Sequence, residues 1–339
     1  MQPMCLRWFA ALSALGAMTA AAATRPHYGG TLRVEIRQNI ETADPPQSGR
    51  GPADLAGAFA IERWEAGREA VYAADENAAG GRPYLDRVEV QLARPLRDQG
   101  IDLELGKADI VELAPTDVRR AVANRRIWTS APVRLLALVF GPRVTDARVR
   151  QALALAVDRA AIHNVLLQGQ GEISGGLLPG WISGYAFLFS TSMDVNQARS
   201  LAASLAPASR ALTMSAGDPG LRPIADRVAL NARDAGLTVS VIRNGNADVR
   251  LVEARIESEE PARALAGIAA ALGLGEPAAA SSPEGWFAAE RALLDGFRAI
   301  PLVHLPDVYG VGPRVRGGPG VTPLGEWRFG DLWVEENRP

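Results

Sequence analysis

Residues 134–179 read RLLALVFGPRVTDARVRQALALAVDRAAIHNVLLQGQGEISGGLLP and decide the fold. The apolar run at residues 135–140 is closed by a Gly-Pro pair, a pattern that predicts a buried strand. Thr145 can then cap a helix, with Asp146 in its first turn facing the positive end of the helix dipole. Apolar residues recur every four positions from there to Leu166, and glycines follow. This spacing predicts one long helix that is buried along a broad face.

The segment VTDARVRQALALAVDR, followed by a Gly-rich turn and GGLLP, resembles the signature region of family 5 extracellular solute-binding proteins. These proteins are the dipeptide and oligopeptide receptors that deliver ligand to ABC importers. The resemblance includes the Asp-x-x-Val-Arg-x-Ala order and the Asp158-Arg159 pair. It implies an α/β fold with the two-lobe, type II architecture of periplasmic binding proteins and mixed sheets.

Composition limits the class of partner. The chain has 339 residues, of which 47% are hydrophobic and 22% are charged, as in an ordinary soluble globular protein. This length is large for one hydrophobic core, so roughly two domains are expected. A formal net charge of −2 provides no basic field for nucleic acid or anionic lipid. We therefore expect no nucleic-acid partner.

The N-terminus has the pattern of a targeting segment. Arg7 is followed by apolar or small residues at 8–22, and the alanines up to Ala23 offer a small-x-small cleavage site. We predict a signal peptide at residues 1–23 and a periplasmic or secreted protein; an uncleaved anchor is the alternative. Cys5 is the one cysteine of the chain. Cleavage would remove it, which excludes disulfides and cysteine-bound metals from the exported chain.

Two further stretches match the family on either side of a gap. YGGTLRVEI at residues 28–36 predicts a strand, and mature family receptors begin with such a GGTL strand and an Asp-Pro loop. NAAGGRPYLD at residues 77–86 resembles a later family segment. A sizeable subdomain lies between these segments in full-length members, whereas about ten residues connect Pro46 to Gly57 here, too few for an independent core. The resemblance therefore implies that one subdomain is trimmed.

Two crossings between lobes are expected along the chain. Apolar strands near Leu138 and Leu302 carry the chain out of the first lobe and back again. We assign residues 24–138 and 302–339 to lobe I and residues 139–301 to lobe II. Within lobe II, a strand–helix–strand order suits an α/β domain.

The segment ADVRLVEARIESEE, residues 247–260, is where a ligand-binding carboxylate is expected. In peptide-binding relatives this strand continues into a Trp and then an Asp that pairs with the terminal amine of the ligand. Matching Pro261 to the relatives' Pro puts Ala254 at the Trp and Glu257 at the Asp. The resemblance thus implies that Glu257 can hold an ammonium group through a charge-assisted bond. The alternative is a solvated acidic rim without a binding role.

Four further residues are candidate ligand contacts. Trp181, Tyr185 and Tyr309 can line the cleft or fill core, and His304 lies on the returning strand near the inferred hinge. No histidine spacing suggests a metal site, and no nucleophile elbow, phosphate loop or dinucleotide fingerprint is present. We expect no catalytic residue, no metal and no cofactor.

These observations lead to one functional expectation and one alternative. The protein is expected to be no enzyme but a monomeric substrate-binding component of an ABC importer. It would capture a short peptide or other small solute between its lobes and, after hinge closure, present it to permease subunits in the inner membrane. The alternative is a degenerate scaffold that acts as an envelope interaction protein without transport.

Overall fold

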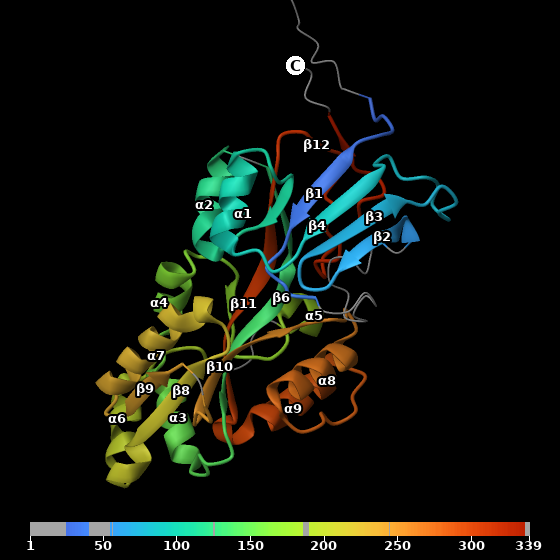
Figure 1. Cartoon of the computed structure of the whole chain (residues 1–339). Helices are drawn as coiled ribbons and strands as arrows, with labels where there is room; N and C mark the ends of the chain where they lie inside the picture. The colour runs from blue at the N-terminus through green and yellow to red at the C-terminus, as the bar shows by residue number, and fades with distance from the viewer. Residues whose placement is uncertain are drawn as a thin grey trace, which may run out of the picture.

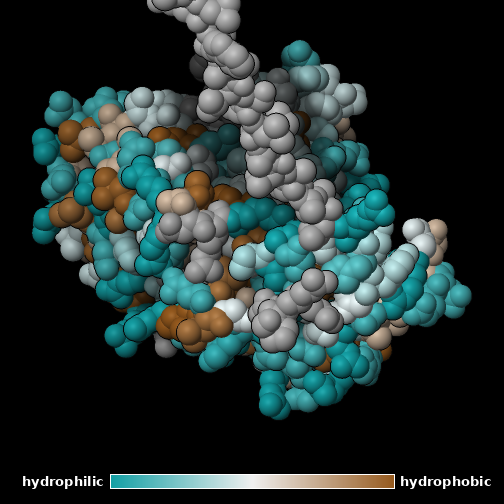
Figure 2. Space-filling model, turned by 90° about the horizontal axis from the view of Figure 1, so that it is seen from above, coloured by the Kyte–Doolittle hydropathy of each residue, from teal (hydrophilic) through white to brown (hydrophobic). Residues whose placement is uncertain are grey.

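The computed structural model describes residues 25–40, 55, 57–124, 126–185, 190–243 and 245–335. The predicted signal peptide at residues 1–23 lies outside these ranges. Within them, no helix combines the length and the apolar character needed to cross a bilayer. Figure 2 views the molecule from above: most of this surface is hydrophilic, and the hydrophobic residues among those described form a few separate areas.

A single mixed sheet connects the two halves of the described chain (Figure 1). Its 11 described strands follow the order β2-β3-β4-β1-β5-β11-β6-β10-β8-β9, and β7 pairs with β11. The bounds of these strands are β1 Thr31–Glu35, β2 Phe59–Glu65, β3 Glu69–Ala74, β4 Arg87–Gln91, β5 Ile110–Glu112, β6 Arg126–Phe140, β7 Glu172–Ile173, β8 Ala211–Ala216, β9 Thr238–Ile242, β10 Val249–Arg255 and β11 Ala299–Val311.

The long strands β6 and β11 join the two halves. They have 15 and 13 residues and pair antiparallel along their lengths. Residues 134–140 of β6 also pair with β10, whereas residues 309–311 of β11 pair with β5. Between these regions Pro132 lies opposite Pro306, and the register shifts on both sides of Pro306. Proline has no N–H to donate, so the ladder is weakest here. That the chain crosses between lobes near Leu138 and Leu302 stays a prediction. The positions at which β6 and β11 exchange their outer partner strands, β10 and β5, lie closer to Pro132 and Pro306.

The upper half contains β1 to β5 with the helices α1 (Leu96–Glu104) and α2 (Pro115–Asn124) beside them (Figure 1). The C-terminal segment, which includes the short pair β12 (Val315–Arg316) and β13 (Trp333–Val334), packs back onto this sheet. Trp327 and Phe329 stack at 5.2 Å between ring centroids in its core. β1 ends and β2 begins too close together in sequence for a further domain core between them, which fits a trimmed subdomain.

The lower half has helices on both faces of its sheet. Leu136 and Leu138 of β6 pack on the face covered by α3, α6 and α7, and Leu135 and Ala137 pack on the face covered by α5 and α8. This alternation follows the two-residue period of a strand, and a strand buried on both faces is apolar throughout. The bounds of these helices are α3 Ala147–Ala156, α5 Gly180–Ser183, α6 Val195–Ala203, α7 Arg222–Asp234, α8 Pro261–Leu272 and α9 Pro283–Leu294.

The signature region was predicted to form one long helix, and this prediction is wrong because the helix is interrupted after Ala156. Asp146 caps α3 by accepting a hydrogen bond from the backbone N–H of Arg148 at 2.9 Å. α3 ends at Ala156, and Asp158 caps a new start, α4 (Arg159–Ala161), which continues as a π-helical turn (Ile162–Leu166). The break follows from the capping side chain and from Arg159, whose Nε donates to the carbonyl of Pro301 at 2.8 Å and ties the turn to β11.

Candidate functional site

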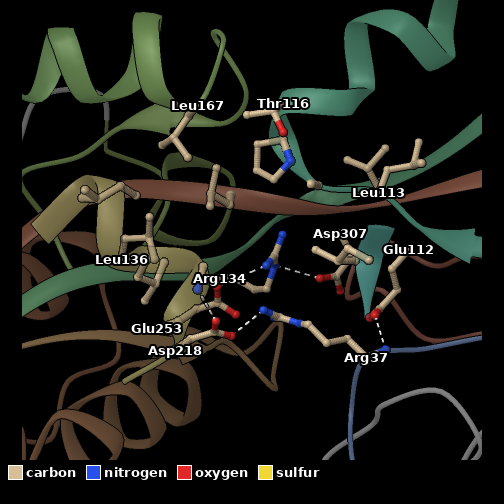
Figure 3. Close-up of a pocket in the computed structure, with 18 of the residues that line it drawn as sticks. Arg37, Glu112, Leu113, Thr116, Arg134, Leu136, Leu167, Asp218, Glu253 and Asp307 are labelled. Carbon is tan, nitrogen blue, oxygen red and sulfur yellow. Dashed lines mark hydrogen bonds and ion pairs between the residues drawn. The ribbon is translucent and has the colours of Figure 1, made fainter. Parts of the chain in front are cut away.

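A cavity of about 630 Å³ lies between the upper and lower halves (Figure 3). The upper half contributes the chain after β1, the end of β5 and the start of α2. The lower half contributes the π-helical turn, β10, and the one-turn 3₁₀ helix Pro219–Leu221 with the start of α7. β6 and β11 form the floor, since both lining sets meet on them. Solute sites occur at such junctions between two packed units.

Much of the wall is apolar. Leu113, Leu136 and Leu167 come from three separate elements and gather around the cavity in Figure 3. Val165 stands at its edge with 69% of its surface exposed. Contact with a solute would remove this apolar surface from water, which is favourable.

Four charged residues form the polar floor, and we call Arg134, Arg255, Glu253 and Asp307 the arginine cluster. Arg134 pairs with Glu253 at 3.2 Å and with Asp307 at 2.9 Å, and Arg255 pairs with Asp307 at 2.6 Å. Burial would lower the pKa of Arg134, but the nearby carboxylates, Glu253 first, raise it above its ordinary value. The guanidinium group therefore stays charged, and both carboxylates are held by it.

The break in the β6–β11 ladder supports this floor. Asp307 donates its backbone N–H to the Ser130 hydroxyl at 2.8 Å, and Arg134 donates to the carbonyl of Pro306 at 2.7 Å. Side chains thus replace the ladder hydrogen bonds that the facing prolines cannot make. This arrangement turns the Asp307 carboxylate toward Arg134 (Figure 3).

One ion pair crosses the cavity. Arg37, two residues after β1, contacts Asp218 of the lower half with 2.5 Å between Nη1 and Oδ2. Both side chains remain well exposed, at 43% and 39%. Arg37 also donates its backbone N–H to Glu112 at the end of β5, at 2.5 Å. The contact joins the two halves across the cavity.

Of the five residues predicted to bind ligand, the structure places Tyr309 in the cavity wall. Its ring meets Trp327 edge-on at 6.2 Å between centroids, and burial raises the pKa of the phenol. Glu257 is exposed and lies beyond the end of β10, outside the cavity lining. Glu253, four residues earlier, is the carboxylate of this strand that reaches the cavity. A binding role for Glu257 stays a prediction.

Tyr185 and His304 lie on the other side of β11, in a group that we call the turn cluster: Tyr185, Glu290 and His304 around Leu177. Glu290 accepts hydrogen bonds from the backbone N–H groups of Leu177 and Leu178 and from the hydroxyl of Tyr185. The buried His304 contacts the Leu177 carbonyl through Nε2 at 3.0 Å. These residues hold the Gly-Gly-Leu-Leu turn of the signature region.

Trp181 also lies outside the cavity lining. Its side chain is 38% exposed, and its indole N–H donates to the carbonyl of Pro132 at 3.0 Å. Its predicted role as a ligand contact stays untested, as do those of Tyr185 and His304. Among the described residues no group of three or more His, Cys, Asp or Glu side chains is arranged to hold a metal ion.

Sequence reasoning missed most of the charged residues around the cavity. A signal for them was present, because Arg134 and Asp307 are charged residues within mostly apolar strands, and Glu112 ends a short apolar strand. A charge in a buried strand needs a partner or a function. Arg37 and Asp218 lie in loops, and no local pattern marks them.

Comparison with known proteins gives one match to a family model and many matches to solved structures. The model described as bacterial extracellular solute-binding proteins, family 5 Middle, matches residues 10–273. The oligopeptide-binding protein AppA of Bacillus subtilis is 28% identical over 123 residues, which is 35% of this chain and 23% of that protein.

Two solved structures show the fold. The ABC transporter substrate-binding protein CtaP of Listeria monocytogenes matches with a TM-score of 0.67 at 16% identity, over 83% of this chain and 67% of that one. The murein tripeptide-binding protein MppA of Escherichia coli matches with a TM-score of 0.69 at 17% identity, over 82% of this chain and 64% of that one. The predicted two-lobe, periplasmic-binding-protein-like α/β architecture with a trimmed subdomain is therefore confirmed.

Proposed function

Because this chain belongs to the bacterial extracellular solute-binding proteins of family 5, we propose that it captures a short peptide or similar small solute in the cavity between its halves. The resemblance predicted from the signature region is confirmed by that membership. We further propose that the loaded protein delivers its solute to the permease subunits of an ABC importer in the inner membrane. A periplasmic or secreted location fits this family of extracellular proteins.

The cavity is the observation that carries the proposal. A volume of about 630 Å³, apolar walls and a few placed charges are typical of a small-molecule site. The weak point of the β6–β11 ladder at Pro132 and Pro306 is suited to act as a hinge, since few backbone hydrogen bonds would have to change there. Three relatives support a peptide as guest: an oligopeptide-binding protein, a murein tripeptide-binding protein and a receptor in complex with the peptide STSA.

The proposal places no chemical step on the solute. The family consists of binding proteins, and the charged side chains of the arginine cluster are engaged with one another. A monomer remains the expected state, because each half contributes to one cavity within a single chain.

A screen of a defined mixture of dipeptides and tripeptides by native mass spectrometry, followed by calorimetry on the hits, tests the proposal. We expect saturable binding of at least one peptide at one site. Thr116→Trp places a bulky side chain at the cavity wall on α2 and should weaken that binding at least tenfold. Val122→Trp is the matched control, since Val122 is exposed on the same helix and is not part of the lining.

Two results would contradict the proposal. Either no peptide binds saturably, as the alternative of an envelope interaction protein without transport requires, or Thr116→Trp and Val122→Trp bind equally well. In the second case the solute would bind elsewhere on the molecule.

A further inference from the structure

Most of the charged residues that line the cavity form ion pairs with one another. The three arginines of the lining all contact carboxylates of the lining, through the pairs Arg37–Asp218, Arg134–Glu253, Arg134–Asp307 and Arg255–Asp307. A guest that carries a free carboxylate would have to displace one of these internal partners. The cavity therefore has no ready cation for an anionic group.

Glu112 is the carboxylate of the lining that lacks such a partner. Among the described residues, no charged side-chain nitrogen of Lys, Arg or His forms an ion pair with its oxygens. One oxygen accepts the backbone N–H of Arg37 at 2.5 Å, and no hydrogen bond from the described part of the chain reaches the other oxygen. Figure 3 shows Glu112 at the edge of the cavity, beside Arg37 and Asp307.

The backbone around Glu112 is fixed, so the carboxylate is presented rather than loose. Its own N–H donates at 2.8 Å to Gln99 of α1, a side chain that is fully buried. Gln99 in turn donates to the carbonyl of Arg94 at 2.9 Å. A side chain held by a second layer of contacts keeps its geometry when a guest binds.

Burial disfavours the charged form of the Glu112 carboxylate, and a bound cation would offset this effect. Loss of water raises the pKa of Glu112, and the nearby Asp307 raises it further, while the backbone N–H and charge of Arg37 and the charge of Arg134 act in the opposite sense. An ammonium group in contact with the free oxygen would favour the charged form through a charge-assisted hydrogen bond, and so lower this pKa.

We propose that Glu112 binds a cationic group of the guest, and that the cavity selects solutes in which an ammonium or guanidinium group is joined to an apolar body. The apolar body would contact Leu113, Leu136 and Leu167. This inference rests on the proposed function and deepens it, because it assigns recognition of the amine to β5 of the upper half. The exposed Glu257 has no part in it.

Calorimetry with matched probes tests the inference. Leu-Leu amide carries one cation and no carboxylate, and N-acetyl-Leu-Leu carries one carboxylate and no cation. Wild type should bind Leu-Leu amide at least tenfold more tightly than N-acetyl-Leu-Leu. Glu112→Gln keeps the size of the side chain and should weaken Leu-Leu amide binding at least tenfold while leaving N-acetyl-Leu-Leu binding unchanged. Glu257→Gln is the control and should bind both probes as wild type does.

The outcomes separate this inference from the proposed function. Equal binding of the two probes by wild type would overturn the proposal for Glu112. This measurement needs no variant, so its result does not depend on whether Glu112→Gln folds. Loss of Leu-Leu amide binding in Glu257→Gln but not in Glu112→Gln would also overturn it. In both cases saturable binding that Thr116→Trp abolishes leaves the proposed function standing. If neither these probes nor the peptide mixture binds, both ideas fail together.

Discussion

The arginine cluster and the turn cluster each include one residue of β11, Asp307 and His304, yet burial affects their charges in opposite ways. In the arginine cluster, two guanidinium groups hold two carboxylates in contact, so the charges are kept. In the turn cluster, Glu290 and His304 have no arginine or lysine within ion-pair distance among the described residues. Burial raises the pKa of Glu290 and lowers that of His304 to about 4.

The difference separates the wall of the proposed solute site from a group of residues that supports the chain. A balanced set of charges can border a cavity and remain stable when water leaves. A set of hydrogen bonds without counter-ions is suited to bind backbone groups, and the turn cluster binds those of Leu177 and Leu178. Polar residues of β11 thus serve two purposes according to the face of the strand on which they lie.

The largest expected effect comes from removing the central cation of the arginine cluster. Arg134→Met leaves Glu253 without the arginine that pairs with it, while Asp307 keeps Arg255. An uncompensated carboxylate in a mostly buried position should lower the free energy of unfolding by about 3 kcal/mol or more. Urea denaturation followed by circular dichroism measures this difference.

An exposed ion pair provides the control for that measurement. Arg68 pairs with Glu65 at 2.8 Å on the β2–β3 hairpin, and 78% of the Arg68 side chain is exposed. Arg68→Met should cost less than about 1 kcal/mol, because water already solvates both charges. If Arg134→Met costs no more than Arg68→Met, the arginine cluster is not a buried charge network and the contrast between the clusters disappears.

A smaller effect should appear in the turn cluster when the pH is lowered. The pKa of His304 is about 4 in the folded protein, whereas an unfolded histidine titrates near pH 6.5. Between these values the unfolded chain takes up a proton that the folded chain does not. Stability is therefore lost as the pH falls, by about 2 kcal/mol between pH 7 and pH 5. His304→Gln can still donate to the Leu177 carbonyl and should lack this loss.

The contribution of His304 is obtained as the difference in unfolding free energy between wild type and His304→Gln at each pH. The raised pKa of Glu290 acts in the opposite sense, since the folded protein binds that proton before the unfolded chain does. Glu290 is present in wild type and in His304→Gln, so its contribution cancels when their unfolding free energies are subtracted at each pH. A subtracted curve that is flat from pH 7 to pH 5 would show that His304 is charged or solvated in the folded state.

The contrast also shows how far the sequence alone could lead. Apolar runs located β6 and the strand near Leu302, which is β11, because the pattern of a buried strand is a local property. The cavity is not local, since β6, β10 and β11 meet there from distant parts of the chain. The resemblance to the family implied Glu257 as the binding carboxylate, whereas pairing with β6 brings Glu253 opposite Leu136 and to the cavity.

The break in the signature helix was missed for a related reason. Asp158 and Arg159 fit the helical spacing of the signature region. In the structure Asp158 caps a new helical turn, and Arg159 reaches the Pro301 carbonyl of β11, a partner far away in sequence. A capping side chain can be recognised in a sequence, but a long-range anchor such as Arg159 cannot.

The smallest expected effect concerns the ion pair between Arg37 and Asp218. It carries opposite charges, as the arginine cluster does, but water reaches both of its side chains, unlike those of either cluster. Arg37→Gln should weaken Leu-Leu amide binding less than about fivefold at low salt, because an exposed pair contributes at most about 1 kcal/mol. The difference from wild type should vanish at about 1 M salt, where charges are screened within about 3 Å. The backbone N–H that Arg37 donates to Glu112 is unchanged by this substitution, so recognition of the amine should persist. Calorimetry at both salt concentrations measures the effect, and a loss of tenfold or more that salt does not remove would place this pair with the buried arginine cluster and make it a determinant of binding.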